Sequence, residues 1–151
     1  SLDAVQARGC TLLAPGLTVD AALVPQLPDR LLEAQGVFER TGGIHAAGIF
    51  TRTGERLVVM EDVGRHNAVD KVIGHQLMQR ALPASDDVLV VSGRASFEVV
   101  QKAVAAGLPI LVAVGAPSSL AVDLARQFGQ TLIGFARNGG FNVYTRPERV
   151  G

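Results

Sequence analysis

The stretch VLVVSGRASFEVVQKAVAAGLPILVAVGAPSSLAVDLARQFGQTLIGF, residues 88–135, decides the fold. It contains three continuous apolar runs, at 88–91, 110–114 and 132–135. Runs of this kind are typical of strands that are covered on both faces. The intervening segments 96–106 and 118–128 are predicted to be helices, the second with Ser118 as its N-cap. Alternation of strand and helix predicts right-handed crossovers and parallel strand pairing.

Upstream of this stretch the pattern predicts a hairpin followed by a helix. Apolar segments at 45–50 and 57–60 flank the turn-rich residues 51–56, which is typical of a β-hairpin. A helix is predicted to start near Arg65. Its apolar residues recur at three- and four-residue steps, as expected of one buried stripe: Val69, Val72, Ile73 and Leu77.

The two ends of the chain complete the predicted architecture. Residues 1–26 are interpreted as an extended lead-in, and residues 27–151 as one domain. A helix is predicted from Pro28, ending at the glycines of 41–43, and a last strand at 142–145 is expected at a sheet edge. The predicted fold is an α/β class, three-layer α/β/α sandwich with a mixed sheet.

The composition of the chain excludes several classes of function. The chain has 151 residues, 48% of them hydrophobic, which suits one domain, since domains usually have about 100–200 residues. Its charges balance to zero and it has no Trp and one Tyr, so neither nucleic acid nor a membrane surface is expected as a partner. The single Cys10 excludes an internal disulfide and is interpreted as incidental. No charged-then-apolar leader is present, and a cytoplasmic location is expected.

The chemistry gathers in loops that leave the carboxyl ends of the predicted strands, where open α/β sheets hold ligands. The first loop opens the motif EDVGRHNAVDK, residues 61–71. Arg65, Arg94 and Arg137 place guanidinium forks on three of these loops, and such groups bind phosphate well. Glycine-rich polar loops are also ordinary turn chemistry. The four loops are Glu61–His66, Ser92–Ser96, Gly115–Ser119 and Ala136–Gly140.

His66 and Asp70 lie four residues apart on the predicted helix and therefore share a face. Asp70 either orients His66 for proton transfer or pairs with it for stability. Other catalytic signatures are missing from the sequence. It has no G-x-S-x-G elbow and no P-loop, and three scattered histidines with one cysteine form no zinc motif.

Several of these segments resemble the FdhD/NarQ family of formate dehydrogenase accessory proteins, in order from about Leu27 to Arg149. The motif of residues 61–71 is specific to that family. The matching blocks are Thr41–Ala47, Glu61–Lys71, Ser92–Ser96 with Glu98, Gly115–Ala121, Gly134–Arg137 and Asn142–Thr145.

The resemblance implies a fold similar to cytidine deaminases and a role in maturing molybdenum or tungsten enzymes. Family members accept sulfur from a cysteine desulfurase and pass it to the metal of a bis-guanine-dinucleotide pterin cofactor, which then enters the formate dehydrogenase catalytic subunit. Guanosine diphosphate (GDP) would mimic part of that cofactor. A homodimer is plausible for the family. We expect the cofactor to be bound by Gly64, Arg65, His66, Ser92, Gly93, Arg94, Ser96, Gly115, Ser118, Ser119 and Arg137.

Two departures limit what the resemblance transfers. The family carries sulfur on a Cys-Gly-x-Cys-Gly loop just before a segment that resembles residues 1–5, so this loop is expected upstream of Ser1. Cys10 is not in a matching context. We therefore expect a C-terminal fragment without catalytic residues, which binds nucleotide but does not transfer sulfur. His45 is followed by two alanines rather than the H-x-E of zinc deaminases, so neither zinc nor deamination is expected.

Two alternatives to cofactor binding stay open. One is a docking module for the dehydrogenase and the desulfurase, without chemistry of its own. The other, weaker alternative is an unrelated hydrolase that uses His66 and Asp70.

Overall fold

The structure, a computed structural model, describes residues 10–35 and 44–151. Its elements follow the predicted order of hairpin, helix and β–α units. They are η1 (Val24–Gln26), α2 (Leu27–Glu33), β1 (His45–Thr51), β2 (Arg56–Asp62), α4 (Arg65–Met78), β3 (Asp87–Val91), α5 (Phe97–Ala105), β4 (Ile110–Ala113), α6 (Ser119–Phe128), β5 (Thr131–Arg137), β6 (Gly140–Thr145) and η2 (Pro147–Arg149).

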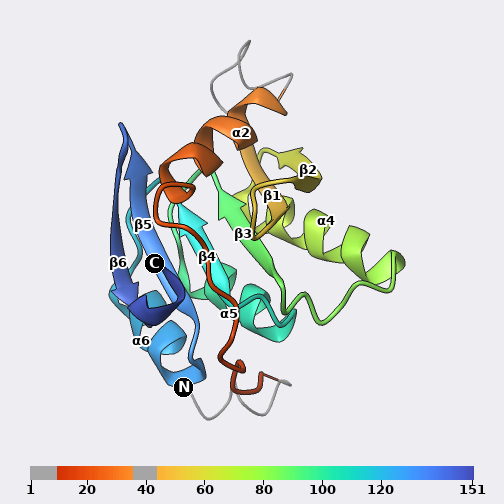
Figure 1. Cartoon of the computed structure of the whole chain (residues 1–151). Coiled ribbons are helices and arrows are strands. Elements are labelled where there is room, and N and C mark those ends of the chain that lie inside the picture. Colours follow the sequence, from red (N-terminus) through yellow and green to blue (C-terminus); the bar gives the residue numbers. More distant parts are fainter. Residues whose placement is uncertain (1–9, 36–43) are drawn as a thin grey trace.

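One mixed sheet of six strands forms the centre of the molecule, in the order β2-β1-β3-β4-β5-β6 (Figure 1). Strands β3, β4 and β5 are parallel, whereas β1 is antiparallel to both β2 and β3, and β6 is antiparallel to β5. The predicted apolar runs are these central strands, and all four residues of β4 are buried. Their continuous hydrophobicity follows from burial on both faces.

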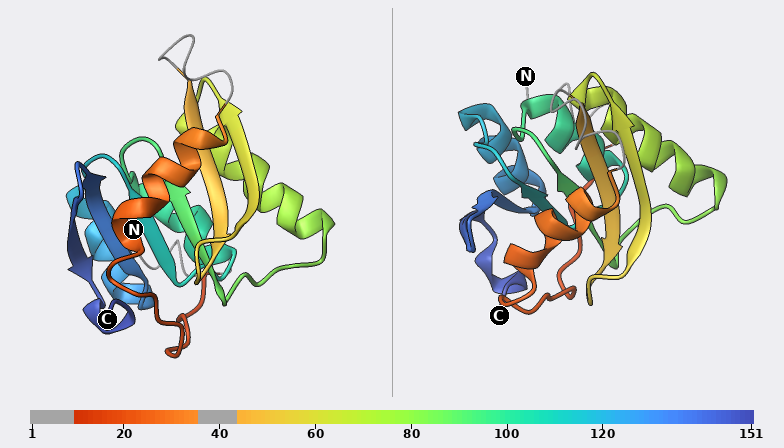
Figure 2. Two further views of the ribbon diagram at one scale, coloured as in Figure 1. Left: turned by 45° about the horizontal axis from the view of Figure 1, so that its top comes forward. Right: turned by 90° about the horizontal axis from the view of Figure 1, so that it is seen from above.

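Helices cover both faces of the sheet, as the two views in Figure 2 show. Helices α4, α5 and α6 pack on one face in a core that includes Leu89 and Leu111. Helix α2 and η1 pack on the other face in a core that includes Val90 and Val112. Neighbouring residues of one strand thus face different cores, as the period of two requires. The predicted α/β class with three layers and a mixed sheet is confirmed, and the likeness to cytidine deaminases stays a prediction.

The described part of the predicted lead-in packs into the domain. Leu17, Val19 and Leu23 belong to the core beneath α2, and the backbone of Val19 bridges to Val150. Cys10 is a core residue, and the interpretation that it has no chemical role stays a prediction. Its side chain is 2% exposed in the core on the opposite face, and burial raises the pKa of its thiol. Burial of a small apolar-like side chain explains the position of Cys10 without any chemistry.

Three sequence predictions differ from the structure. Helix α2 ends at Glu33, with Ala34 as its C-cap, well before the predicted stop at residues 41–43, which lie outside the described residues. The sequence pattern predicts Leu77 in the buried stripe of α4, but its side chain is 63% exposed. This end of α4 projects beyond the sheet, and none of the described elements covers it (Figure 1). Strand β6 begins at Gly140 rather than 142. Among the described helices, none has the length and apolar character needed to cross a membrane.

Candidate functional site

The predicted loops do lie at one edge of the sheet. Because β1 is antiparallel to both of its neighbours, β2 runs in the same direction as β3, β4 and β5. The carboxyl ends of these four strands therefore share an edge, at the top of Figure 1, and the right panel of Figure 2 looks down on it. Ligand sites of open α/β sheets occur at this edge.

A cavity of about 360 Å³ opens at this edge where three helices begin. Arg65 is the first residue of α4, Ser96 is the N-cap of α5, and Ser118 is the N-cap of α6; all three line the cavity with Arg94. The Ser96 Oγ accepts the Val99 N–H at 3.4 Å, and the Ser118 Oγ accepts that of Ala121 at 3.1 Å. Helix N-termini carry a partial positive charge, so the cavity, which we call the cationic cavity, favours an anion.

One buried donor in the cationic cavity is unpaired. Within residues 10–35 and 44–151, the Arg65 Nε has no hydrogen-bond partner, although it is buried. Guanidinium groups present several donors in a rigid fork, and an unpaired buried donor costs free energy. An anion in the cavity would supply the missing acceptor.

Arg137 lies in a different cavity. It lines a space of about 250 Å³ on the α2 side of the sheet, and its guanidinium carbon is 5.1 Å from the centre of the Phe135 ring. Phe135 has a positive φ of 52° at a register shift of β5, which redirects the chain at this point. The prediction that Arg137 joins Arg65 and Arg94 in one cluster is therefore wrong. This second space, the α2 cavity, is lined by Pro28, Asp29, Leu31, Leu32, Gln35, Ser92, Val114, Ala136, Arg137 and Asn138.

Two glycines separate the cavities. In the loop after β3, Ser92 lines the α2 cavity and Arg94 the cationic cavity, with Gly93 between them. In the loop after β4, Val114 lines the α2 cavity and Ala116 the cationic cavity, with Gly115 between them. The Gly115 N–H donates to the Gly93 carbonyl at 3.0 Å. A Cβ on Gly115 would lie 3.1 Å from that carbonyl oxygen, so the close approach of the loops needs glycine. The two residues that form the ridge between the cavities thus have no side chains of their own, and the His45 ring lies against Gly93.

Some backbone N–H groups at this edge, which the sequence analysis expected to bind a ligand, donate to carbonyls of neighbouring loops instead. The Ala95 N–H donates to the Ala116 carbonyl at 3.2 Å, and the Ser118 N–H returns to the Ala95 carbonyl at 3.1 Å. The Phe135 N–H donates to the Gly115 carbonyl at 3.1 Å. These bonds join the loops into a continuous rim. Anion binding here therefore depends on the arginine side chains and on the remaining first-turn N–H groups of the helices.

Gly64 and Ser119 line neither cavity. Gly64 is the N-cap of α4, and its N–H donates to the Asp62 Oδ1 at 2.9 Å. This hydrogen bond, together with the Lys71 ammonium 2.9 Å from the other carboxylate oxygen, lowers the pKa of Asp62 to about 2. Asp62 therefore stays ionised and anchors the turn between β2 and α4.

His66 and Asp70 do not interact in the way that their spacing suggested. The His66 Nε2 lies 3.1 Å from the Ser96 Oγ and 3.9 Å from the Glu98 carboxylate, both from α5. Asp70 instead accepts the Lys102 ammonium at 2.7 Å. The proposed His66–Asp70 proton relay is therefore absent, and with it the support for a hydrolase. His66 contacts the rim of the cationic cavity through Ser96.

Sequence reasoning missed Gln35 at this edge and gave His45 no part in the site. Gln35 lines the α2 cavity although it follows a helix with no recognisable motif. His45, at the start of β1, lies against Gly93, where an added Cβ would be 3.2 Å from its Nδ1. No local pattern marks Gln35, and the contact of His45 with Gly93 depends on long-range packing.

The sulfur-carrying cysteine loop was expected upstream of Ser1. Ser1 lies outside the described residues, which begin at Cys10. The expected position of that loop, and the expectation that this chain has no catalytic residues of its own, therefore stay predictions.

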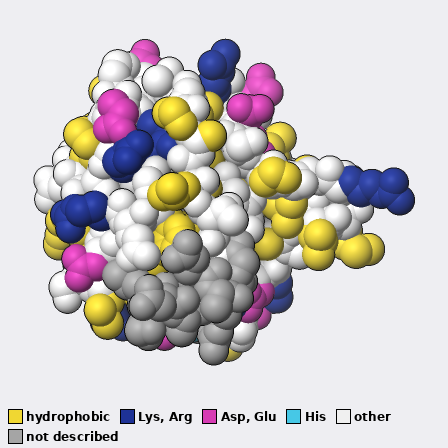
Figure 3. Space-filling view, turned by 90° about the horizontal axis from the view of Figure 1, so that it is seen from below, with side chains coloured by type: hydrophobic (Ala, Val, Ile, Leu, Met, Phe, Trp, Pro, Cys, Tyr) yellow, Lys and Arg dark blue, Asp and Glu magenta, His cyan; other side chains and the backbone are white. Residues whose placement is uncertain are grey.

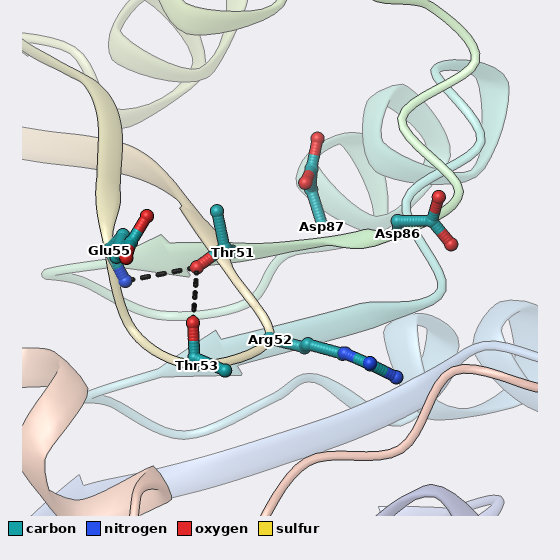
Figure 4. A pocket seen from close by; sticks show the side chains of 6 residues that line it. All are labelled: Thr51, Arg52, Thr53, Glu55, Asp86 and Asp87. Carbon is teal, nitrogen blue, oxygen red and sulfur yellow. Dashed lines mark hydrogen bonds between the residues drawn. The ribbon is translucent and has the colours of Figure 1, made fainter.

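The opposite edge of the sheet holds a cavity of about 440 Å³ with the reverse charge. Figure 4 shows the side chains that line it, Thr51, Arg52, Thr53 and Glu55 from the hairpin with Asp86 and Asp87, so three carboxylates and one guanidinium are present. Burial and the neighbouring Asp86 raise the pKa of Asp87. Such an environment repels anions.

Seen from below in Figure 3, the projecting end of α4 also carries exposed apolar side chains.

No metal cluster is visible in the part of the chain that the structure describes: no three His, Cys, Asp or Glu side chains there are grouped to hold an ion. The expectation of no zinc stays a prediction.

Comparisons with known proteins agree with the family resemblance. The chain is 57% identical over 152 residues to the sulfur carrier protein FdhD of Streptomyces coelicolor, covering 99% of this chain and 54% of that protein. It is 52% identical over 132 residues to the FdhD of Sulfurisphaera tokodaii, covering 87% of this chain and 52% of that protein. The chain therefore spans about half the length of these relatives.

A solved structure shares the fold. The crystal structure of a formate dehydrogenase accessory protein from Desulfotalea psychrophila matches with a TM-score of 0.84 and 32% identity, over 95% of this chain and 60% of that one. The sequence pattern of the FdhD/NarQ family matches residues 2–151. The chain belongs to the FdhD/NarQ family.

Proposed function

We propose that this domain holds a phosphate-bearing pterin cofactor for sulfur transfer. In the whole protein, sulfur from a cysteine desulfurase would pass to the molybdenum or tungsten of a bis-guanine-dinucleotide pterin, the cargo, before it enters formate dehydrogenase. Family membership and the names of the relatives support the sulfur-carrier role. The single Cys10 is buried, so it is unsuited to carry sulfur, and the role of this chain is to bind the cargo.

The observation that carries the proposal is the cationic cavity, where Arg65 and Arg94 meet the N-termini of three helices. Phosphates there would gain charge-assisted hydrogen bonds, including one to the unpaired Arg65 Nε. A nucleotide that spans the ridge of Gly93 and Gly115, where His45 is the side chain against Gly93, would place its ring in the α2 cavity. The two cavities thus match the two halves of a nucleotide.

Titration with GDP tests the proposal. Calorimetry on the wild-type chain is expected to show binding, and Arg94→Ala is expected to weaken it about 10- to 100-fold, the loss of one charge-assisted hydrogen bond. Arg126→Ala is the matched control, because Arg126 is an exposed arginine of α6 that pairs only weakly with Asp123 at 3.6 Å. Absence of GDP binding to the wild-type chain, or equal losses in both variants, would contradict the proposal.

A docking module is the second candidate, favoured by the exposed apolar end of α4. Leu77 and Met78 are 63% and 81% exposed there. Exposed apolar side chains of this kind occur at protein interfaces. Under this reading, the dehydrogenase or desulfurase would be captured by the domain while GDP leaves its melting temperature unchanged. Leu77→Ser with Met78→Ser would then abolish capture, which the cofactor-holding reading does not predict.

A further inference from the structure

We propose that Gln35 selects the ring of the bound cofactor by donating a hydrogen bond from its side-chain amide to a ring acceptor. This inference rests on the proposed function, because it places a ring in the α2 cavity. It assigns a specificity role to a residue that no sequence motif marks.

The first observation is an unpaired donor in a buried place. Gln35 is 2% exposed, and within the described residues its Nε2 has no hydrogen-bond partner. Native structures pair nearly all buried polar groups, since an unpaired one forfeits its hydrogen bonds to water. Gln35 also lines the α2 cavity, so an acceptor in that cavity would satisfy the amide.

Backbone hydrogen bonds tie Gln35 to the end of α2. The Gln35 N–H donates to the Leu32 carbonyl at 3.0 Å, and the preceding Ala34 N–H donates to that of Leu31 at 3.2 Å, closing the last turn of α2. Leu31 is itself buried in the core. The backbone from which the Gln35 side chain extends is therefore held in position before a ligand arrives, which lowers the ordering cost of binding.

The walls of the α2 cavity suit a planar heteroaromatic ring. Leu31, Val114 and Ala136 provide apolar surface, and the Ser92 Oγ is already bonded by the Ala46 N–H at 2.9 Å. Apolar walls with a few polar groups are typical of small-molecule pockets. The ring would lie between these walls with its polar edge toward Gln35.

The polar groups indicate which ring edge is preferred. Gln35 offers a buried donor, and the exposed carboxylate of Asp29 offers an acceptor at the same cavity. A carbonyl oxygen next to ring N–H groups complements this pair, whereas the amino group of adenine would face the Gln35 donor with another donor. Guanine and pterin share the preferred edge, a 2-amino-oxopyrimidine. The inferred ligand class is therefore this edge, whichever ring carries it.

The test uses the complete 151-residue chain with two substitutions of similar size. Gln35→Met removes the donor without adding charge, and Gln35→Glu replaces the amide with an acceptor. Gln127→Glu on the exposed surface of α6 is the matched control. Calorimetry with GDP, ADP, pyrophosphate and free pterin-6-carboxylate follows a melting curve that verifies folding. If the glutamate variant does not fold, the methionine variant decides.

We expect both Gln35 variants to bind GDP about tenfold or more weakly than wild type while pyrophosphate affinity stays unchanged. Gln35→Glu should lose less affinity for ADP than for GDP. If the pterin rather than GDP loses affinity, the ring that Gln35 contacts is the pterin, and the inference still holds.

Two outcomes separate failure of the inference from failure of the proposed function. If Arg94→Ala weakens GDP binding but GDP and pterin affinities in both Gln35 variants stay within twofold of wild type, the Gln35 inference is wrong and the cofactor site stands. If the wild-type chain does not bind GDP, the proposed function itself is overturned, whether or not pyrophosphate binds.

Discussion

The two edges of the sheet hold cavities of opposite character. At the carboxyl edge, Arg65 and Arg94 line about 360 Å³ beside three helix N-termini. At the other edge, three carboxylates, those of Glu55, Asp86 and Asp87, line about 440 Å³ with a single guanidinium, that of Arg52. The chain is neutral overall, so its net charge conceals two local sites of opposite sign. The β–α units produce the difference, because each places the start of its helix at the carboxyl edge.

Two aspartates report the same contrast. Asp62 at the carboxyl edge has its pKa lowered to about 2 by the Gly64 N–H and Lys71. Asp87 begins β3 at the opposite edge, where burial and Asp86 raise its pKa. One residue type thus responds in opposite directions to the two environments. A carboxylate is stabilised where donors point at it and destabilised where it is crowded by another carboxylate.

The largest effect is expected from removing both arginines of the cationic cavity. Arg65→Ala combined with Arg94→Ala should weaken GDP binding about 100-fold or more in calorimetry, since two charge-assisted contacts are lost. Arg52→Ala, at the acidic cavity of the other edge, should leave binding unchanged. If Arg52→Ala weakened GDP binding as much as the double variant, the cationic cavity would not be the site where GDP binds.

A smaller effect is expected from filling the ridge between the two cavities of the carboxyl edge. Gly115→Ala places a Cβ 3.1 Å from the Arg94 backbone nitrogen and should lower the free energy of unfolding by about 1–3 kcal/mol in urea denaturation. Gly74→Ala is the control, because no atom lies within 4 Å of its added Cβ, and it should stabilise α4 by up to about 1 kcal/mol. Equal stabilities for the two variants would show that the loops do not need close contact.

Acid should weaken the carboxyl edge through Asp62. Its lowered pKa means that the ionised form stabilises the fold above its ordinary pKa of 3.8, and that this contribution is lost as the pH falls toward about 2. Thermal melts of the wild-type chain should therefore lose more stability between pH 4 and pH 2 than those of Asp62→Asn. Asp123→Asn controls for the removed charge. Parallel losses in wild type and Asp62→Asn would contradict the assignment.

The smallest effect is expected at Asp87, with the opposite sign. Because its pKa is raised, the ionised carboxylate disfavours folding at neutral pH, and this penalty disappears once acid protonates it. Asp87→Asn should therefore melt slightly higher than wild type at pH 7, with the difference vanishing at acidic pH. A lower melting temperature for Asp87→Asn at pH 7 would show that its ionised form is stabilising.

Local patterns predicted the scaffold well. The continuous apolar runs became β3, β4 and β5, and Ser96 and Ser118 cap the helices that follow β3 and β4. Such features depend on residues within a few positions of one another. The motif at 61–71 also placed the start of α4 at Arg65. These are the features that periodicity and capping chemistry encode directly.

Pairings across the chain were less predictable. Helical spacing put His66 and Asp70 on one face, but α5 supplies closer partners for each, namely Ser96 and Lys102. Arg137 was grouped with Arg65 and Arg94 because all three follow strands. The register shift near Phe135 and the packing of α2 place it in the other cavity. A sequence lists loops in order but does not state which face of the sheet each side chain occupies.

The sequence by itself determined that this chain forms an α/β sheet with glycine- and arginine-bearing loops at one edge, because apolar period and helix caps are local properties. Only the tertiary structure decided that these loops build two cavities rather than one, and that Gln35 reaches the α2 cavity while Cys10 is buried. Those outcomes depend on contacts between segments far apart in the chain. Local sequence patterns are compatible with several such arrangements, and packing and hydrogen bonding determine which of them forms.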